Sequence, residues 1–76
     1  MMIVVRAPLM SDKIRDLLDN KTIGGVRFAF VEKRGMELAF RISGDGIESK
    51  DVVGIAKSAI KSTDFGKGIY FSVIKG

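Results

Sequence analysis

Alternating apolar and polar residues mark two neighbouring stretches of the chain. Apolar side chains stand at every second position from Val26 to Phe30 and again from Met36 to Ile42. A period of two is typical of strands with one buried face. The connector Lys33-Arg34-Gly35 fits a three-residue loop that ends in a left-handed glycine. The pattern therefore predicts a β-hairpin.

The length of this connector sets an expected register. It pairs Phe28 with Phe40 and puts all the large apolar side chains of the hairpin on one face, as a half-buried sheet requires. The same register puts Arg27 directly opposite Arg41. Like charges facing each other destabilise a sheet, so we expect a bound anion or a neighbouring acid to relieve this pair.

Helical spacing of apolar residues appears in two other stretches. The first runs over residues 12–20 after the capping residue Ser11, and the second follows Ser49. The expected core-facing residues are Ile14, Leu17 and Leu18 in the first helix and Val52, Ile55, Ala56, Ala59 and Ile60 in the second.

Two further strands complete the expected order. Residues 2–7 are rich in β-branched side chains, and alternation resumes from Ile69 to Ile74. The order strand, helix, strand, strand, helix, strand predicts an α/β (α+β) fold, a ferredoxin-like βαββαβ two-layer sandwich. Both helices would lie on one face of a four-stranded antiparallel sheet. Residues 1–76 are expected to form a single domain.

The composition narrows the chemistry. The chain has 46% hydrophobic and 29% charged residues, which is typical of a folded domain, and it lacks both cysteine and histidine. Those absences remove the most common metal ligand, the most common general base and the thiol nucleophile. We therefore expect a non-enzymatic protein with no metal and no cofactor.

The apolar runs are short. None approaches the ~20 residues that span a bilayer, and Arg6 interrupts the apolar start of the chain. We therefore expect no membrane partner and take the cytoplasm as the default location. The formal net charge of +4 permits an anionic partner.

The uncovered face of the expected sheet is the strongest candidate for function. Alternation sends basic side chains to this face while the phenylalanines point towards the helices. Guanidinium groups can contact phosphates, and a tyrosine ring can stack on a base. The sequence thus predicts an anion-binding or nucleic-acid-binding site made of Arg6, Arg27, Arg41, Lys33 and Tyr70.

Two other interpretations of the same face remain open. The arginine stems can simply lie over apolar neighbours with their charged ends in water. Alternatively, the face is a self-association surface of a homo-oligomeric regulatory or adaptor domain, which could also sense a small ligand. The apolar residues that would form this surface are Met2, Val4, Ala29, Val31, Ala39 and Ile74.

The segment from Phe28 to Glu32 resembles part of the aromatic signature of the RNA-recognition motif. In that family the signature lies on the third strand with its aromatic side chains exposed, whereas here it lies on the second expected strand. Exposing Phe28 would turn Arg27 into the core, which costs several kcal/mol per ion. The parity of the strand therefore argues against membership of that family.

Overall fold

The computed structural model describes all of residues 1–76 and contains one five-stranded sheet. Its strands lie in the order β2-β3-β4-β1-β5, and all neighbouring strands are antiparallel. The strands are β1 (Met2–Arg6), β2 (Lys21–Ile23), β3 (Val26–Arg34), β4 (Glu37–Ser43) and β5 (Ser72–Lys75). The helices are α1 (Ser11–Leu18), α2 (Val52–Lys61) and α3 (Asp64–Lys67), with a 3-10 turn, η1, at Ile47–Ser49.

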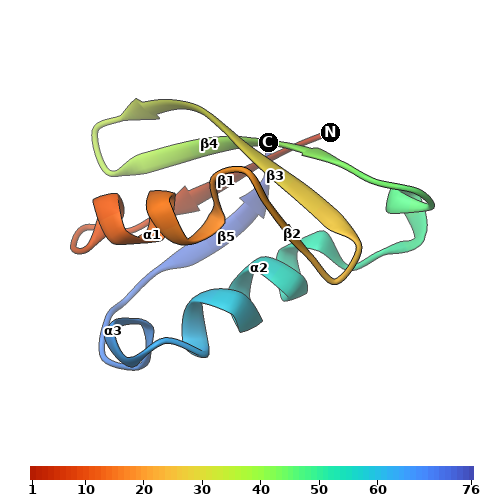
Figure 1. Ribbon diagram of the computed structural model, residues 1–76. Helices are drawn as coiled ribbons and strands as arrows, with labels where there is room; N and C mark the ends of the chain where they lie inside the picture. The colour runs from red at the N-terminus through yellow and green to blue at the C-terminus, as the bar shows by residue number, and fades with distance from the viewer.

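The helices cover one face of the sheet and leave the other face open (Figure 1). The core lies between these two layers and contains no buried polar or charged residue. At its centre, Phe28 and Phe40 are fully buried and meet edge to face, with their ring centroids 6.5 Å apart. Because these rings point towards the helices, their neighbours along the strands point to the open face.

The expected four-stranded, two-helix ferredoxin-like sandwich is wrong, although the general α+β class holds. The additional strand is β2, which pairs with the start of β3 through a two-residue turn. That turn consists of Gly24 and Gly25, whose φ angles of 59° and 78° are accessible to glycine at little cost. The additional helix is α3, which Thr63 caps by accepting a hydrogen bond from the backbone N–H of Gly66.

The expected hairpin register is also wrong. β3 and β4 are joined by a two-residue turn, Gly35-Met36, so that Arg34 lies opposite Glu37. A β-bulge between Phe30 and Glu32 absorbs one residue, Val31, and beyond it Phe30 lies opposite Phe40. The bulge keeps both phenylalanines on the helix side despite the shorter turn, because one additional residue reverses the alternation of the strand.

Helix starts also differ from the expected ones. α1 begins at Ser11 itself, after Met10 in a left-handed conformation with φ of 63° and no side-chain cap. The cap of α2 is Asp51, whose carboxylate accepts from the backbone N–H of Gly54 at 3.0 Å. Ser49 lies instead in η1, where its hydroxyl donates to the carbonyl of Gly46.

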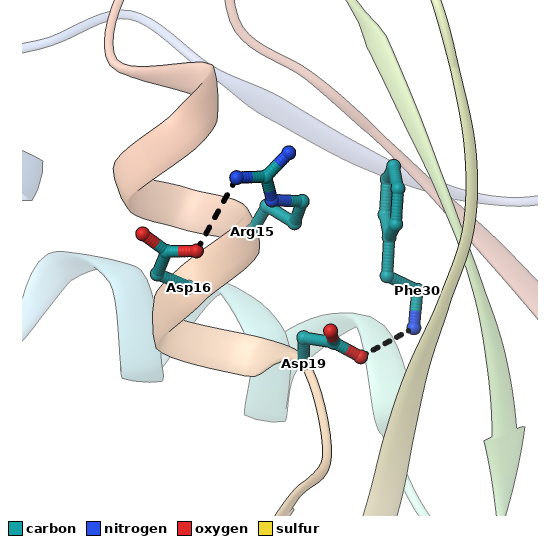
Figure 2. Close-up of polar contacts among 4 residues, drawn as sticks. All are labelled: Arg15, Asp16, Asp19 and Phe30. Atoms are coloured by element: carbon teal, nitrogen blue, oxygen red, sulfur yellow. Dashed lines mark hydrogen bonds and ion pairs between the residues drawn. The ribbon is translucent and has the colours of Figure 1, made fainter.

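The end of α1 is fixed to the sheet by one carboxylate. Oδ1 of Asp19 accepts a hydrogen bond from the backbone N–H of Phe30 at 3.0 Å (Figure 2). The Arg15 guanidinium lies 5.8 Å from the centre of the Phe30 ring, within the range of a cation–π contact. Together these contacts hold β3 in place beside the bulge.

Candidate anion-binding face

The strand register assigns the open face residue by residue, because directly opposite residues of an antiparallel pair project to the same side. The side chains form four rows across the sheet. In order along β4 from its end to its start, these rows are Thr22, Arg27 and Ser43; Ala29, Arg41 and Met2; Glu32, Ala39, Val4 and Ile74; and Arg34, Glu37, Arg6 and Ser72.

Arg27 lies in the first row, between two strands that carry hydroxyl groups. Thr22 is its partner on β2 and Ser43 its partner on β4. All three side chains are exposed, and the Arg27 guanidinium also contacts Oδ1 of Asn20 at 3.5 Å. Arg27 forms no salt bridge, so its charge is not neutralised within the chain.

Arg41 lies in the second row, diagonally next to Arg27 rather than opposite it. Its direct partners are Ala29 on β3 and Met2 on β1. Diagonal neighbours on one face of a sheet stand ~7–8 Å apart, so two long side chains there can reach one group. Arg41 is exposed and also forms no salt bridge. The two arginines therefore form a cationic corner, defined here as Arg27, Arg41, Thr22 and Ser43.

The other predicted site residues lie away from this corner. Arg6 is four residues along β1 from the partner of Arg41, a separation of about 13 Å at the usual rise of a strand. Lys33 lies opposite buried Leu38, so the bulge turns it to the helix side of the sheet. Tyr70 is 92% exposed, in the segment before β5 near Arg6. The five residues are thus not brought together into one cluster.

Carboxylates appear on the open face from the third row onward, where Glu32 is the second diagonal neighbour of Arg41. Glu32 forms a salt bridge of 2.9 Å with Arg34, and both side chains are substantially exposed. Glu37 lies between Arg34 and Arg6 in the fourth row and forms no salt bridge or side-chain hydrogen bond. The open face therefore has a cationic corner whose own two rows hold no carboxylate, and directly beside it two rows in which arginines and glutamates mix.

A hollow of about 230 Å³ lies over the third and fourth rows and reaches Met2 in the second row, beside the cationic corner. The side chains of Met2, Val4 and Ala39 provide its apolar part, and its charged rim consists of Glu32, Arg34 and Glu37. Gly76 completes the lining, where its backbone N–H bonds to the carbonyl of Met2. Ile74, which is 57% exposed, lies in the same row as Val4.

The parity inferred from the sequence is confirmed for the part of β3 before the bulge. Phe28 is fully buried while Arg27 is exposed, so the aromatic side chains do not present themselves on the open face as in the RNA-recognition motif. The structure holds no group of three or more carboxylates close enough to bind a metal ion.

Several residues of the open face were not anticipated from the sequence. Thr22 and Asn20 flank Arg27 because β2 lies at the edge of the sheet. The signal that could have revealed β2 is the Gly24-Gly25 pair, a common two-residue hairpin turn. Arg34 was expected in the connector but lies on β3, at the rim of the hollow.

No family model, curated protein or solved structure matches this chain. None of the helices has the length and apolar character that a membrane crossing needs. The class to which the observations lead is therefore an α+β domain with a helix-covered face and an open, cationic sheet face.

Proposed function

We propose that this protein is a cytoplasmic, non-enzymatic binding module that contacts a phosphate-bearing polyanion, single-stranded nucleic acid in particular, through the cationic corner. The observation that carries the proposal is the placement of Arg27 and Arg41. They are diagonal neighbours, exposed, without a salt bridge, and no carboxylate stands in either of their rows.

The energetics of the corner support this proposal. Two like charges ~7–8 Å apart on one face of a sheet repel each other less than direct partners would, and a phosphate bound between them attracts both. Guanidinium groups form paired, charge-assisted hydrogen bonds with phosphate oxygens, and the hydroxyls of Thr22 and Ser43 can donate to the same group. A sheet face open to solvent also gives an extended strand room to lie on it.

Chemical-shift mapping tests this proposal directly. A mixed-sequence single-stranded oligonucleotide is titrated into the isotope-labelled protein at low salt. We expect the largest amide shifts in β2, the first half of β3 and the second half of β4. Shifts concentrated on α1 and α2, or no shifts, would contradict the proposed site.

Self-association through the open face is a second candidate, favoured by the apolar hollow and by exposed Ile74. Sheets with apolar open faces can pack against each other. Light scattering over a range of protein concentrations measures the mass. If the protein is an oligomer, Ala39→Glu, which introduces a charge into the floor of the hollow, is expected to shift it to monomer. A wild type that stays monomeric at high concentration removes this candidate.

A further inference from the structure

The hollow next to the cationic corner has the features of a site for one nucleobase. We infer that it binds a base of the single strand and prefers guanine, an inference that rests on the proposed function. Met2, Val4 and Ala39 supply an apolar surface on which the flat face of a base can lie. Beyond that surface, Arg34 and Glu37 supply a donor and an acceptor side by side.

The pairing of these two residues determines which base fits. Arg34 and Glu37 are direct partners across the hairpin, so their side chains leave the sheet on the same side. Glu37 has no ion-pair partner, and its two carboxylate oxygens are free to accept hydrogen bonds. One terminal nitrogen of Arg34 contacts Glu32 at 2.9 Å, which leaves other N–H groups of the guanidinium free to donate.

Guanine is the base that complements this pair. Its Watson–Crick edge carries the O6 acceptor next to two donors, the N1–H and the N2 amino group. A carboxylate can accept both donors in a bidentate contact while an arginine donates to O6. Adenine and cytosine each offer one donor group beside an unprotonated ring nitrogen, which a carboxylate repels, and uracil offers a single N–H between two carbonyls.

The spacing along β4 connects the base site to the phosphate site. Arg41, Ala39 and Glu37 project to the same face at successive alternate positions. Arg41 and Glu37 are about 13 Å apart along the strand, with Ala39 between them. A nucleotide carries its phosphate and its Watson–Crick edge at opposite ends. One nucleotide can therefore place its phosphate towards Arg41, its ring over Ala39 and its edge towards Glu37.

The volume of the hollow suits a single base. Its volume of about 230 Å³ is smaller than the ~300 Å³ at which pockets for drug-sized ligands begin. The sugar and the phosphates would remain outside, on the surface of the sheet. This arrangement suits one nucleotide of a strand rather than an enclosed free metabolite.

Fluorescence anisotropy with short oligouridine strands tests the inference. The strands carry guanosine, inosine, adenosine, cytidine or uridine at one central position. A bidentate base contact typically discriminates by about five- to 150-fold, so we expect the guanosine strand to bind at least about fivefold tighter than the uridine strand. Inosine, which lacks the N2 amino group, is expected to fall between them.

Glu37→Gln identifies the residue responsible. An amide offers one acceptor oxygen, so the preference for guanosine is expected to fall to within about twofold while binding to all strands persists. Glu48→Gln, which makes the same charge change in η1, is the matched control and is expected to keep the preference.

The possible results separate the two proposals. Equal binding of all five strands that is lost in Arg27→Gln/Arg41→Gln overturns the guanine site and leaves the proposed function standing. Absence of binding to every strand overturns both. Equally tight binding of polyglutamate overturns the base site, because that polymer has negative charge but no base.

Discussion

Asp19 supplies a side-chain acceptor to the backbone of Phe30, with 3.0 Å between Oδ1 and the amide nitrogen (Figure 2). β2 pairs with β3 only as far as Phe28. The next N–H of β3 on the β2 side belongs to Phe30, and no strand lies beside it. The carboxylate of Asp19 takes the place of that strand. The bulge at Val31 follows immediately, and the contact therefore holds β3 at the point where its alternation changes.

Replacing this carboxylate should destabilise the fold. Hydrogen bonds to charged groups contribute roughly 1.5–3 kcal/mol, so Asp19→Ala is expected to lower the free energy of unfolding by about that amount. Urea denaturation measures the change. Asp16→Ala is the matched control, because the Asp16 side chain is 75% exposed and only contacts Arg15 at 3.5 Å. Its expected effect is about 0.5 kcal/mol or less, and equal losses in both variants would contradict the role of Asp19.

Gly66 is expected to tolerate no side chain. It is buried at the junction of α2 and α3, where a Cβ atom would collide with the backbone carbonyl of Ile60 and with the Thr63 hydroxyl. Overpacking of this kind typically costs about 1–3 kcal/mol, and Gly66→Ala should lower the thermal midpoint accordingly. At Gly68 a Cβ atom would meet nothing within 4 Å and φ is −111°. Gly68→Ala should therefore be neutral or slightly stabilising, and a loss as large as that of Gly66→Ala would be inconsistent with this packing.

The bulge at Val31 leads to a prediction about deletion. Without Val31, Phe30 would point to the core and Glu32 to the open face in regular alternation, and the pairing of Arg34 with Glu37 would be kept. Deletion of Val31 is therefore expected to change the free energy of unfolding by less than about 1 kcal/mol. Deletion of Ala29, where the ladder is regular, should cost more than deletion of Val31, because it turns Phe30 to the open face. Denaturation of both deletion variants measures the difference, and an equal loss would contradict the observed register.

The division of the strands into a buried and an open face could be predicted from the sequence. Alternation of residue types is set by the two-residue period of a strand, and it correctly put Phe28 inside and Arg27 outside. The register could not be predicted in the same way. A two-residue turn with a bulge and a three-residue turn without one both put Phe28 and Phe30 on the same face of the sheet as Phe40. The sequence pattern does not distinguish these two arrangements.

The composition of the site was predictable only in part. Arg27 and Arg41 were expected on one face and lie there, but the Gly35-Met36 turn together with the bulge shifts the register by two residues and makes them diagonal neighbours instead of direct partners. Lys33 follows the bulge, so its face depends on a feature that alternation alone does not reveal. β2 was not predicted, because its three residues before the glycine pair are too few to show an alternating pattern. The position of Thr22 beside Arg27 was therefore not predicted either.

The salt dependence of binding tests the cationic corner most directly. Each phosphate contact to a single strand contributes about −0.7 to the slope of log K against log salt concentration. Arg27→Gln/Arg41→Gln is therefore expected to flatten the slope for a mixed oligonucleotide by about 1.4 relative to the wild type. Lys57→Gln/Lys61→Gln, which removes the same charge from exposed positions of α2, should leave the slope nearly unchanged. Equal flattening in both double variants, or no change in the arginine variant, would contradict the account.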